Sequence, residues 1–157
     1  MEHAFQIYKF SRTKIQMKAV NLEESNIFKR VEQVKGKYTT GIQFGTRVEA
    51  TNGRLAYAYL KATVELKDIE TKDIAVGIDV VYKGRFETIE EINVEEFKKW
   101  VDIQVVPQLL PYVRSYVTNT TSAMGIPPIN IPTMDILETI KGNDHHGLGE
   151  GVGNDAH

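Results

Sequence analysis

The sequence contains no cysteine, and this absence excludes several kinds of chemistry. Disulfide bonds, thiol nucleophiles and thiolate zinc sites all require cysteine. The sequence also has no apolar run near the roughly 18 residues that a membrane-spanning helix needs. Its first ten residues, MEHAFQIYKF, lack the basic region and the apolar core of a secretory signal. We therefore expect a cytoplasmic protein with no membrane span.

An excess of positive charge is absent as well. The chain has 19 Lys and Arg residues against 21 Asp and Glu residues, a formal net charge of -2. Because nucleic-acid binding depends on cations that face phosphates, this balance argues against nucleic acid as a partner. A hydrophobic fraction of 41% in 157 residues is typical of one globular domain. We predict a folded domain over residues 1–141 and a disordered, glycine-rich acidic tail over residues 142–157.

Motifs for catalysis and for metal or cofactor binding are also lacking. None of the serines stands in a G-x-S-x-G motif, and the only histidine before the tail is His3. His145 and His146 are adjacent but have no third ligand at a metal-binding spacing. The glycines of GLGEGVG lack the flanking strand and helix of a dinucleotide site. We expect no enzyme activity, no cofactor and no metal.

Alternation of apolar and polar residues predicts four strands. We place the first strand within residues 5–20, and the others at 40–50, 55–66 and 74–86. The polar stretch 21–38 is interpreted as a long crossover loop. Asn52 and Gly53 predict a hairpin between the second and third strands, because both residues tolerate positive φ.

The fourth strand has one apolar face and one open face. Ile78, Val80 and Tyr82 share the apolar face, whereas Asp79 points to the open one. A carboxylate there favours a surface or partner contact over catalysis.

A long helix with internal prolines follows the strands. Asn93 is a good N-cap. A proline inside a helix costs about 3 kcal/mol, so we expect a fresh helix start at Pro107 and a mild bend at Pro111. Gly125 is expected to end this helix as its C′ residue, and a short helix is predicted over residues 134–141.

The predicted elements carry more apolar side chains than one layer of helix can cover. Self-association would bury the excess, at about 25 cal/mol per Å². The alternative is a sheet that curls round the helix and buries these side chains within a monomer. We favour the oligomer.

The stretch PQLLPYVRSYVTNTTSAMGIPPINIPTMDIL resembles the C-terminal helical part of the SecB family of protein-export chaperones. The shared features are Pro111, Tyr112 and Arg114 inside the long helix, the helix end at Gly125, and the connector that runs from there to Ile131. The order of elements agrees over residues 5–141. The resemblance implies an α+β fold: a four-stranded antiparallel sheet with a long crossover after the first strand, packed on one long and one short C-terminal helix.

The resemblance also implies an ATP-independent holdase that binds unfolded polypeptides or preproteins in apolar grooves. It would be a tetramer, built as a dimer of dimers with the long helices between two sheets. The groove positions implied are Phe28, Val31, Ile78, Val80, Tyr82, Met134, Ile136, Leu137 and Ile140. The oligomer-interface positions implied are Ile78, Val80, Tyr82, Leu110, Val113 and Val117.

Three other functional interpretations stay open. A specialised chaperone, such as those paired with toxin–antitoxin systems, would use the same grooves. A small-molecule binder would hold an apolar ligand in a cavity between sheet and helix. An interaction module would form one tight complex with a single partner.

A partner-docking surface on the outer sheet face is also implied. In typical SecB proteins this face is acidic and docks the zinc-bearing tail of the SecA motor. Asp79 matches the fourth-strand carboxylate, but the first-strand positions are Lys14 and Lys18 here, which reverses the charge. Coulomb attraction to a basic SecA segment should therefore be weaker.

Overall fold

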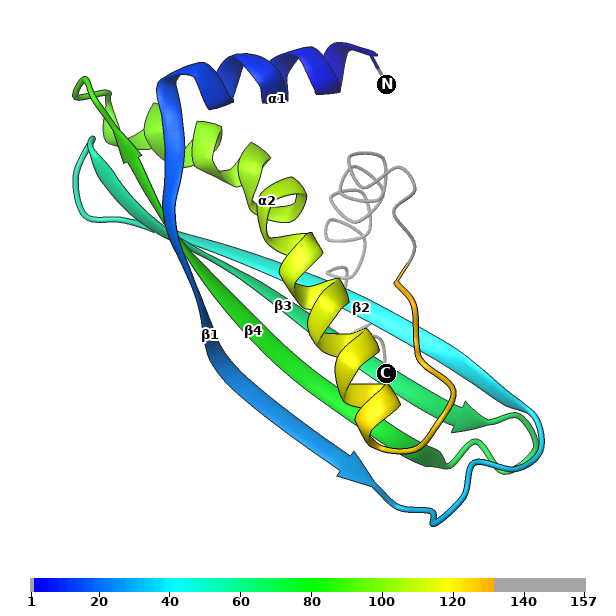
Figure 1. Cartoon of the computed structure of the whole chain (residues 1–157). Helices are drawn as coiled ribbons and strands as arrows, with labels where there is room; N and C mark the ends of the chain where they lie inside the picture. Colours follow the sequence, from blue (N-terminus) through cyan, green and yellow to red (C-terminus); the bar gives the residue numbers. More distant parts are fainter. Residues whose placement is uncertain (1, 132–157) are drawn as a thin grey trace, which may run out of the picture.

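Alternating apolar side chains build one antiparallel sheet of four long strands. The computed structural model describes residues 2–131, and its strands are β1 (Ile15–Lys29), β2 (Tyr38–Ala50), β3 (Leu55–Asp68) and β4 (Ile74–Thr88). Their order across the sheet is β1-β4-β3-β2, so the chain crosses over between β1 and β2 (Figure 1). Every neighbouring pair is antiparallel. The predicted sheet is confirmed.

The long helix α2 (Val94–Ala123) lies across one face of this sheet, which we call the inner face (Figure 1). The side chain of Asn93 accepts hydrogen bonds from the backbone N–H groups of Glu95 and Glu96, as expected of an N-cap. At the other end Gly125 has a φ of 74°, the left-handed conformation predicted for the C′ residue.

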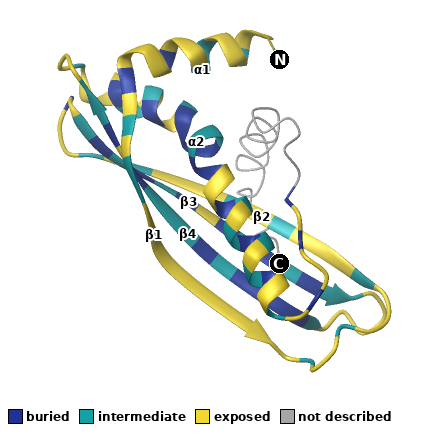
Figure 2. Cartoon of the chain, in the orientation of Figure 1, coloured by how far each residue is buried: buried dark blue, intermediate teal, exposed yellow. Residues whose placement is uncertain are grey.

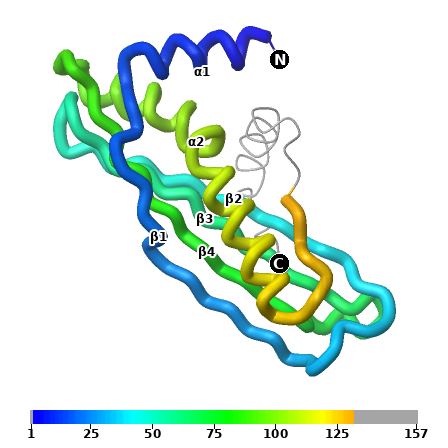
Figure 3. Tube along the Cα trace, in the orientation of Figure 1, coloured from blue at the N-terminus to red at the C-terminus, as the bar shows by residue number. Residues whose placement is uncertain are grey.

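The prediction of a fresh helix start at Pro107 is wrong. Both Pro107 and Pro111 lie inside one continuous helix. Val105 before them, Leu109 between them and Val113 after them are fully buried in the same core. Burial of this continuous stripe outweighs the hydrogen bonds that the prolines remove. Figure 3 shows the axis of α2 changing direction between its two halves, where the prolines lie.

The N-terminal residues form a helix, α1 (Glu2–Lys14), where we predicted part of the first strand. Ala4, Ile7, Tyr8 and Ser11 follow helical spacing and are its less exposed residues. The same stretch also has apolar residues at alternate positions, which predicted a strand. The helical pattern is the one that the structure follows. Figure 1 shows α1 beside the first turns of α2.

The first strand continues further than predicted. β1 runs through residues 21–29, and only residues 30–37 connect it to β2. Every side chain from Asn21 to Lys29 is exposed, as the yellow half of β1 in Figure 2 shows. A strand with no covered face has no reason to alternate, which explains why this segment was taken for a loop.

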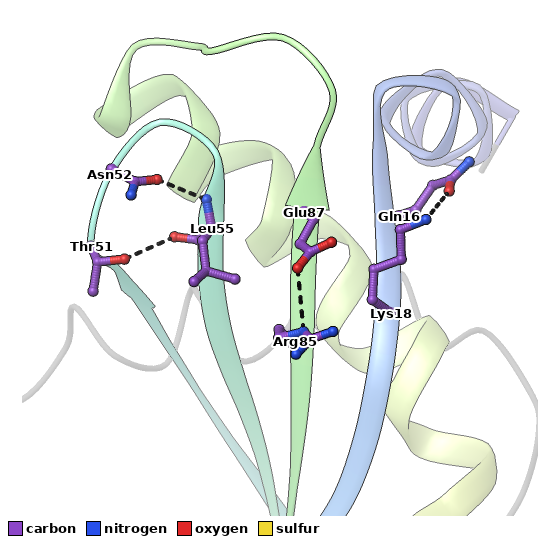
Figure 4. Close-up of polar contacts among 7 residues, drawn as sticks. All are labelled: Gln16, Lys18, Thr51, Asn52, Leu55, Arg85 and Glu87. Carbon is purple, nitrogen blue, oxygen red and sulfur yellow. Dashed lines mark hydrogen bonds and ion pairs between the residues drawn. The ribbon is translucent and has the colours of Figure 1, made fainter.

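The predicted hairpin between β2 and β3 is confirmed, but its predicted backbone conformation is wrong. Within residues 2–131, positive φ occurs at Lys72, Gly36 and Gly125, and so not in this hairpin. Instead the side chain of Asn52 accepts from the backbone N–H groups of Arg54 (2.8 Å) and Leu55 (2.9 Å). Figure 4 shows the Asn52–Leu55 bond.

The glycine of this hairpin serves close packing. A Cβ atom on Gly53 would collide with the backbone carbonyl of Ile92, in the connection from β4 to α2. The Gly53 carbonyl also accepts from the Ile92 N–H at 3.0 Å. Two connections are thereby held together at one end of the sheet.

The core lies between the inner face of β3 and β4 and the facing side of α2 (Figure 2). The fully buried side chains include Leu60, Val64, Ile78, Val80, Phe86, Phe97, Val101, Val105, Leu109, Val113 and Val117. Neither helix of the described chain has the length and apolarity needed to cross a membrane. The predicted short helix at 134–141 and tail at 142–157 lie outside the described residues.

Candidate functional site

The predicted groove residues do not come together in one place. Ile78 and Val80 lie under α2, where 1% and 0% of their surfaces are exposed. Tyr82 is half-buried on the same inner face, and its ring centroid lies 5.9 Å from that of Tyr112 and 6.4 Å from that of Tyr116. Met134, Ile136, Leu137 and Ile140 lie outside the described residues.

Phe28 and Val31 are separated from this group and from each other. Phe28 is paired with Gly77 and lies on the face opposite α2, which we call the outer face. Its ring covers Gly77 so closely that a Cβ atom there would collide with it. The half-buried Val31 packs instead into a second small core with Leu66 and Ile126.

Five of the six predicted interface residues are already buried within the single chain. At most 2% of each is exposed: Ile78, Val80, Leu110, Val113 and Val117. These side chains have no free surface for a second copy. If substitutions at these positions change the assembly, they must do so by changing how α2 packs on the sheet.

An exposed apolar surface remains between β1 and α2, and sequence reasoning missed it. Leu22 and Ile27 project from β1 on the inner face, opposite Tyr82 and Ile78 respectively. Exposed fractions are 46% for Leu22, 44% for Ile27 and 44% for Tyr112 of α2. We call this surface the β1–α2 ledge; its residues are Leu22, Ile27, Tyr82, Tyr112 and Tyr116.

Ring contacts through Tyr82 and one hydrogen bond at Tyr116 hold the tyrosines of the ledge. The hydroxyl groups of Ser25 and Tyr116 are hydrogen-bonded between β1 and α2. Burial, followed by the proximity of Tyr116, raises the pKa of the Tyr82 hydroxyl above its usual range. The tyrosine rings of the ledge are therefore held by contacts within the chain.

The backbone of β1 borders this ledge. β1 is an edge strand of 15 residues whose neighbour in the sheet is β4. Among the described residues, no strand pairs with its other side. An exposed edge of this length is a ready site for strand addition.

The residues predicted for partner docking lie at separate places. Lys14 ends α1 rather than standing in β1, and its ammonium lies 5.4 Å from the ring centroid of Phe10. Lys18 is exposed on β1 and donates to the side chain of Gln16 at 3.0 Å (Figure 4). Asp79 accepts from the Thr63 hydroxyl at 2.7 Å in the middle of the sheet. The assignment of Lys14 to the outer sheet face is therefore wrong.

A metal ion bound to residues 2–131 would need several of their donor side chains in one place. This part of the chain has no cluster of three or more His, Asp or Glu side chains that could hold a metal ion.

The comparisons with known proteins agree on one family. The model for SecB, described as preprotein translocase subunit SecB, matches residues 4–139. The protein-export protein SecB of Dinoroseobacter shibae is 24% identical over 107 residues, which cover 66% of this chain and 62% of that protein. The SecB of Wolbachia pipientis is 35% identical over 77 residues, 48% of this chain and 46% of that protein.

An uncharacterised protein of Methanocaldococcus jannaschii is 31% identical over 72 residues, 46% of this chain and 44% of that protein. The matches thus span less than two thirds of the length of these curated relatives. Among solved structures, a SecB-like chaperone of Mycobacterium tuberculosis, in complex with a ChAD peptide from an antitoxin, superposes with a TM-score of 0.69 at 16% identity. That match covers 83% of this chain and 97% of the other.

Proposed function

Because the chain belongs to the SecB family, we propose that it is a cytoplasmic holdase chaperone that binds non-native polypeptides without nucleotide. Family membership supports a chaperone role. The fold shared with the M. tuberculosis chaperone supports it too, since that protein was solved with a peptide.

The observation that carries the proposal is the β1–α2 ledge. Leu22 and Ile27 of the extended strand β1 and Tyr112 of α2 each expose nearly half of their surfaces. Such a strip can cover apolar side chains of many unfolded segments, because burial is non-directional and needs no particular sequence. Fixed tyrosine rings add area at a small cost in conformational entropy.

We assign a separate role to the backbone edge of β1, which is pairing with a second copy of the chain. Antiparallel pairing of two β1 edges would join two sheets and place two ledges next to each other. This pairing accounts for a dimer, and packing of two such dimers against each other would complete the proposed dimer of dimers. Solution mass by light scattering tests it, and a monomer at all concentrations would contradict it.

Aggregation of a chemically unfolded model protein such as rhodanese tests the holdase proposal. We expect the chain to suppress aggregation at stoichiometric amounts without nucleotide. The double variant Leu22→Ser with Ile27→Ser should bind client more weakly by about 2 kcal/mol, or roughly 30-fold. Both side chains are already exposed, so the fold should tolerate the change.

A matched control removes apolar surface elsewhere. Ile89, between β4 and α2, is 89% exposed. Ile89→Ser should leave client binding unchanged. Wild-type protein that fails to suppress aggregation, or a ledge variant that matches wild type, would contradict the proposal. One defined apolar ligand in native mass spectra, without client binding, would favour the small-molecule binder instead.

Export through SecA is a separate part of the proposal. The exposed ammonium of Lys18 would repel a basic SecA segment. We therefore expect calorimetry to show weak binding of SecA to this chain. Lys18→Glu should strengthen it. Equal affinity of both forms would show that this position does not contact SecA.

A further inference from the structure

The outer face of the sheet carries two tyrosine rings under cations. Tyr57 and Tyr59 alternate along β3 with buried Ala58 and Leu60, so they face away from α2. The Arg47 guanidinium lies 4.3 Å from the centroid of the Tyr59 ring. These contacts hold the rings in place and desolvate their faces.

Lys83 lies between both rings, with its ammonium 4.5 Å from the Tyr57 centroid and 5.5 Å from the Tyr59 centroid. Its interaction with the Tyr59 hydroxyl raises the pKa of Lys83 above its usual range. Lys83 therefore keeps its positive charge at physiological pH.

A hollow of about 400 Å³ opens beside Tyr59. Its lining comes from all four strands: Glu23, Glu24, Gly45, Thr46, Arg47, Tyr59, Lys61 and Val81. The space at Gly45 is open, since a Cβ atom there would meet nothing within 4 Å. The hollow is large enough to receive one or two side chains of a partner.

The charges of this hollow are separated by sign. Strand register places Glu24, Val81, Lys61 and Gly45 in one row across β1, β4, β3 and β2. Among the lining residues, the carboxylates of Glu23 and Glu24 stand on the β1 side, and the cations of Arg47 and Lys61 stand on the β2 and β3 side. Each side also has a counter-charge beside it, because Arg47 lies 3.4 Å from the Glu49 carboxylate and Lys83 interacts with Glu23. Glu24 and Lys61 are two strand spacings apart, or about 10 Å. The apolar Val81 lies between them.

A β-bulge in β1 adds a second carboxylate to the β1 side of the hollow. The pairing of β1 with β4 shifts between Leu22 and Glu24, so Glu23 is the extra residue. Bulges redirect side chains, and here two successive carboxylates line the same side of the hollow. A regular strand would have sent them to opposite faces.

We propose that this hollow binds an extended peptide segment of a partner protein, in which an acidic side chain and a basic one are three residues apart. An extended chain advances about 3.3 Å per residue, so this spacing matches the 10 Å between the two charged sides. The acidic residue lies against Arg47 and Lys61, and the basic residue against Glu23 and Glu24. An apolar side chain between them packs on Tyr59 and Val81.

Tyrosines and cations on an open sheet would also suit a single-stranded nucleic acid. The carboxylates of Glu23 and Glu24, however, occupy one side of the hollow and would repel a continuous phosphate backbone. A peptide with discrete charges of both signs avoids this repulsion. The peptide is therefore the occupant that the geometry favours.

This site is independent of the proposed client surface. The ledge lies on the inner face and the hollow on the outer face of the same sheet. Failure of the holdase proposal would leave the hollow intact, and the reverse also holds.

Fluorescence anisotropy with two capped, labelled peptides tests the proposal on the full chain. One peptide contains Asp-Ala-Leu-Lys and the other Lys-Ala-Leu-Lys, each between Gly-Ser flanks. Wild type should prefer the first, and Lys61→Glu should weaken its binding about tenfold while strengthening the second. Lys35→Glu, in the connection between β1 and β2, makes the same charge change elsewhere and should alter neither affinity.

Three results would overturn the proposal. One is equal affinity for both peptides in wild type and in Lys61→Glu. Another is loss of peptide binding in the ledge double variant with no effect of Lys61→Glu, because the peptide would then occupy the client surface. The third is tighter binding of a labelled oligothymidine than of either peptide, which would assign the outer face to nucleic acid. Circular dichroism confirms that each variant is folded.

Discussion

Gln104 donates its side-chain amide to the hydroxyl of Ser11 at 2.6 Å, although 93 residues separate them in the sequence. The same amide donates to the backbone carbonyl of Ile15 at 3.2 Å, and the Ser11 hydroxyl donates to the carbonyl of Trp100 at 3.0 Å. Ser11 and Gln104 are buried. One polar cluster therefore joins α1, the start of β1 and α2.

Ser11→Ala tests this cluster. The substitution leaves the buried amide of Gln104 with one acceptor fewer, which should cost about 1 to 3 kcal/mol of stability. Trp100 is the only tryptophan, and its ring centroid lies 5.5 Å from that of Phe10. Denaturant unfolding followed by tryptophan fluorescence therefore reports on the docking of α1.

Thr13→Ala is the matched control on the same helix. Its hydroxyl donates to the carbonyl of Phe10 at 2.7 Å in an exposed position. Its loss should change stability by less than about 0.5 kcal/mol. If Ser11→Ala is as stable as this control, the cluster does not hold α1.

Gly53→Ala should destabilise the fold by at least about 2 kcal/mol. The new methyl group would collide with the backbone carbonyl of Ile92, which cannot rotate away as a flexible side chain could. Gly41→Ala has open space around its Cβ position and should lie within about 0.5 kcal/mol of wild type. Thermal unfolding by circular dichroism compares them, and equal midpoints would contradict the close approach.

Thr121→Val should loosen the attachment of the connector, residues 125–131, to the end of α2. The Thr121 hydroxyl donates to the Val117 carbonyl at 2.8 Å and accepts from the Ile129 N–H at 2.9 Å. Valine has the same shape but leaves that buried N–H without a partner, at a cost of about 1 to 3 kcal/mol. Hydrogen exchange should quicken at Ile129. Unchanged protection of this amide would mean that other contacts hold the connector.

Asp68 should make stability depend on pH in acid. The backbone N–H groups of Thr71 and Glu70 hold the pKa of its carboxyl below the ordinary value of 3.8. Since the folded-state pKa is lowered, this contribution is fully present above about pH 3.8 and is lost as the pH falls through the folded value. Asp68→Asn keeps an acceptor oxygen but cannot titrate.

Urea unfolding between about pH 7 and pH 3 measures the difference. We expect Asp68→Asn to be less stable than wild type at neutral pH, because it lacks the carboxylate, and the difference to shrink in acid as Asp68 is protonated. Identical curves for the two proteins would show that Asp68 does not contribute to the acid dependence.

Most of the fold was predictable because β3 and β4 have one buried face each. Residues such as Leu60, Val64 and Val80 alternate with exposed or half-exposed neighbours, and the long helix begins at a recognisable cap, Asn93. The second half of β1 was not predictable, since an uncovered strand tolerates the polar stretch NLEESN. α1 left a helical signal at Ala4, Ile7 and Ser11 that period 2 obscured.

The candidate site was harder to predict for a related reason. The ledge exists only because Leu22 and Ile27 lie in a strand, and their polar neighbours hid that strand in the sequence. Conversely, the strong apolar signals at Ile78 and Val80 marked the interior of one chain rather than a free groove. Periodicity reveals which side chains are covered, but not what remains uncovered at an edge.

The internal prolines of α2 leave two backbone carbonyls, those of Ile103 and Pro107, without the helical donor that a residue four positions later would supply. Stiffness along a helix depends on these bonds, so α2 is softest in its middle. Both halves are packed on the sheet, and the first half is also bonded to α1 through Gln104. The helix can therefore bend more easily in its middle than in either half.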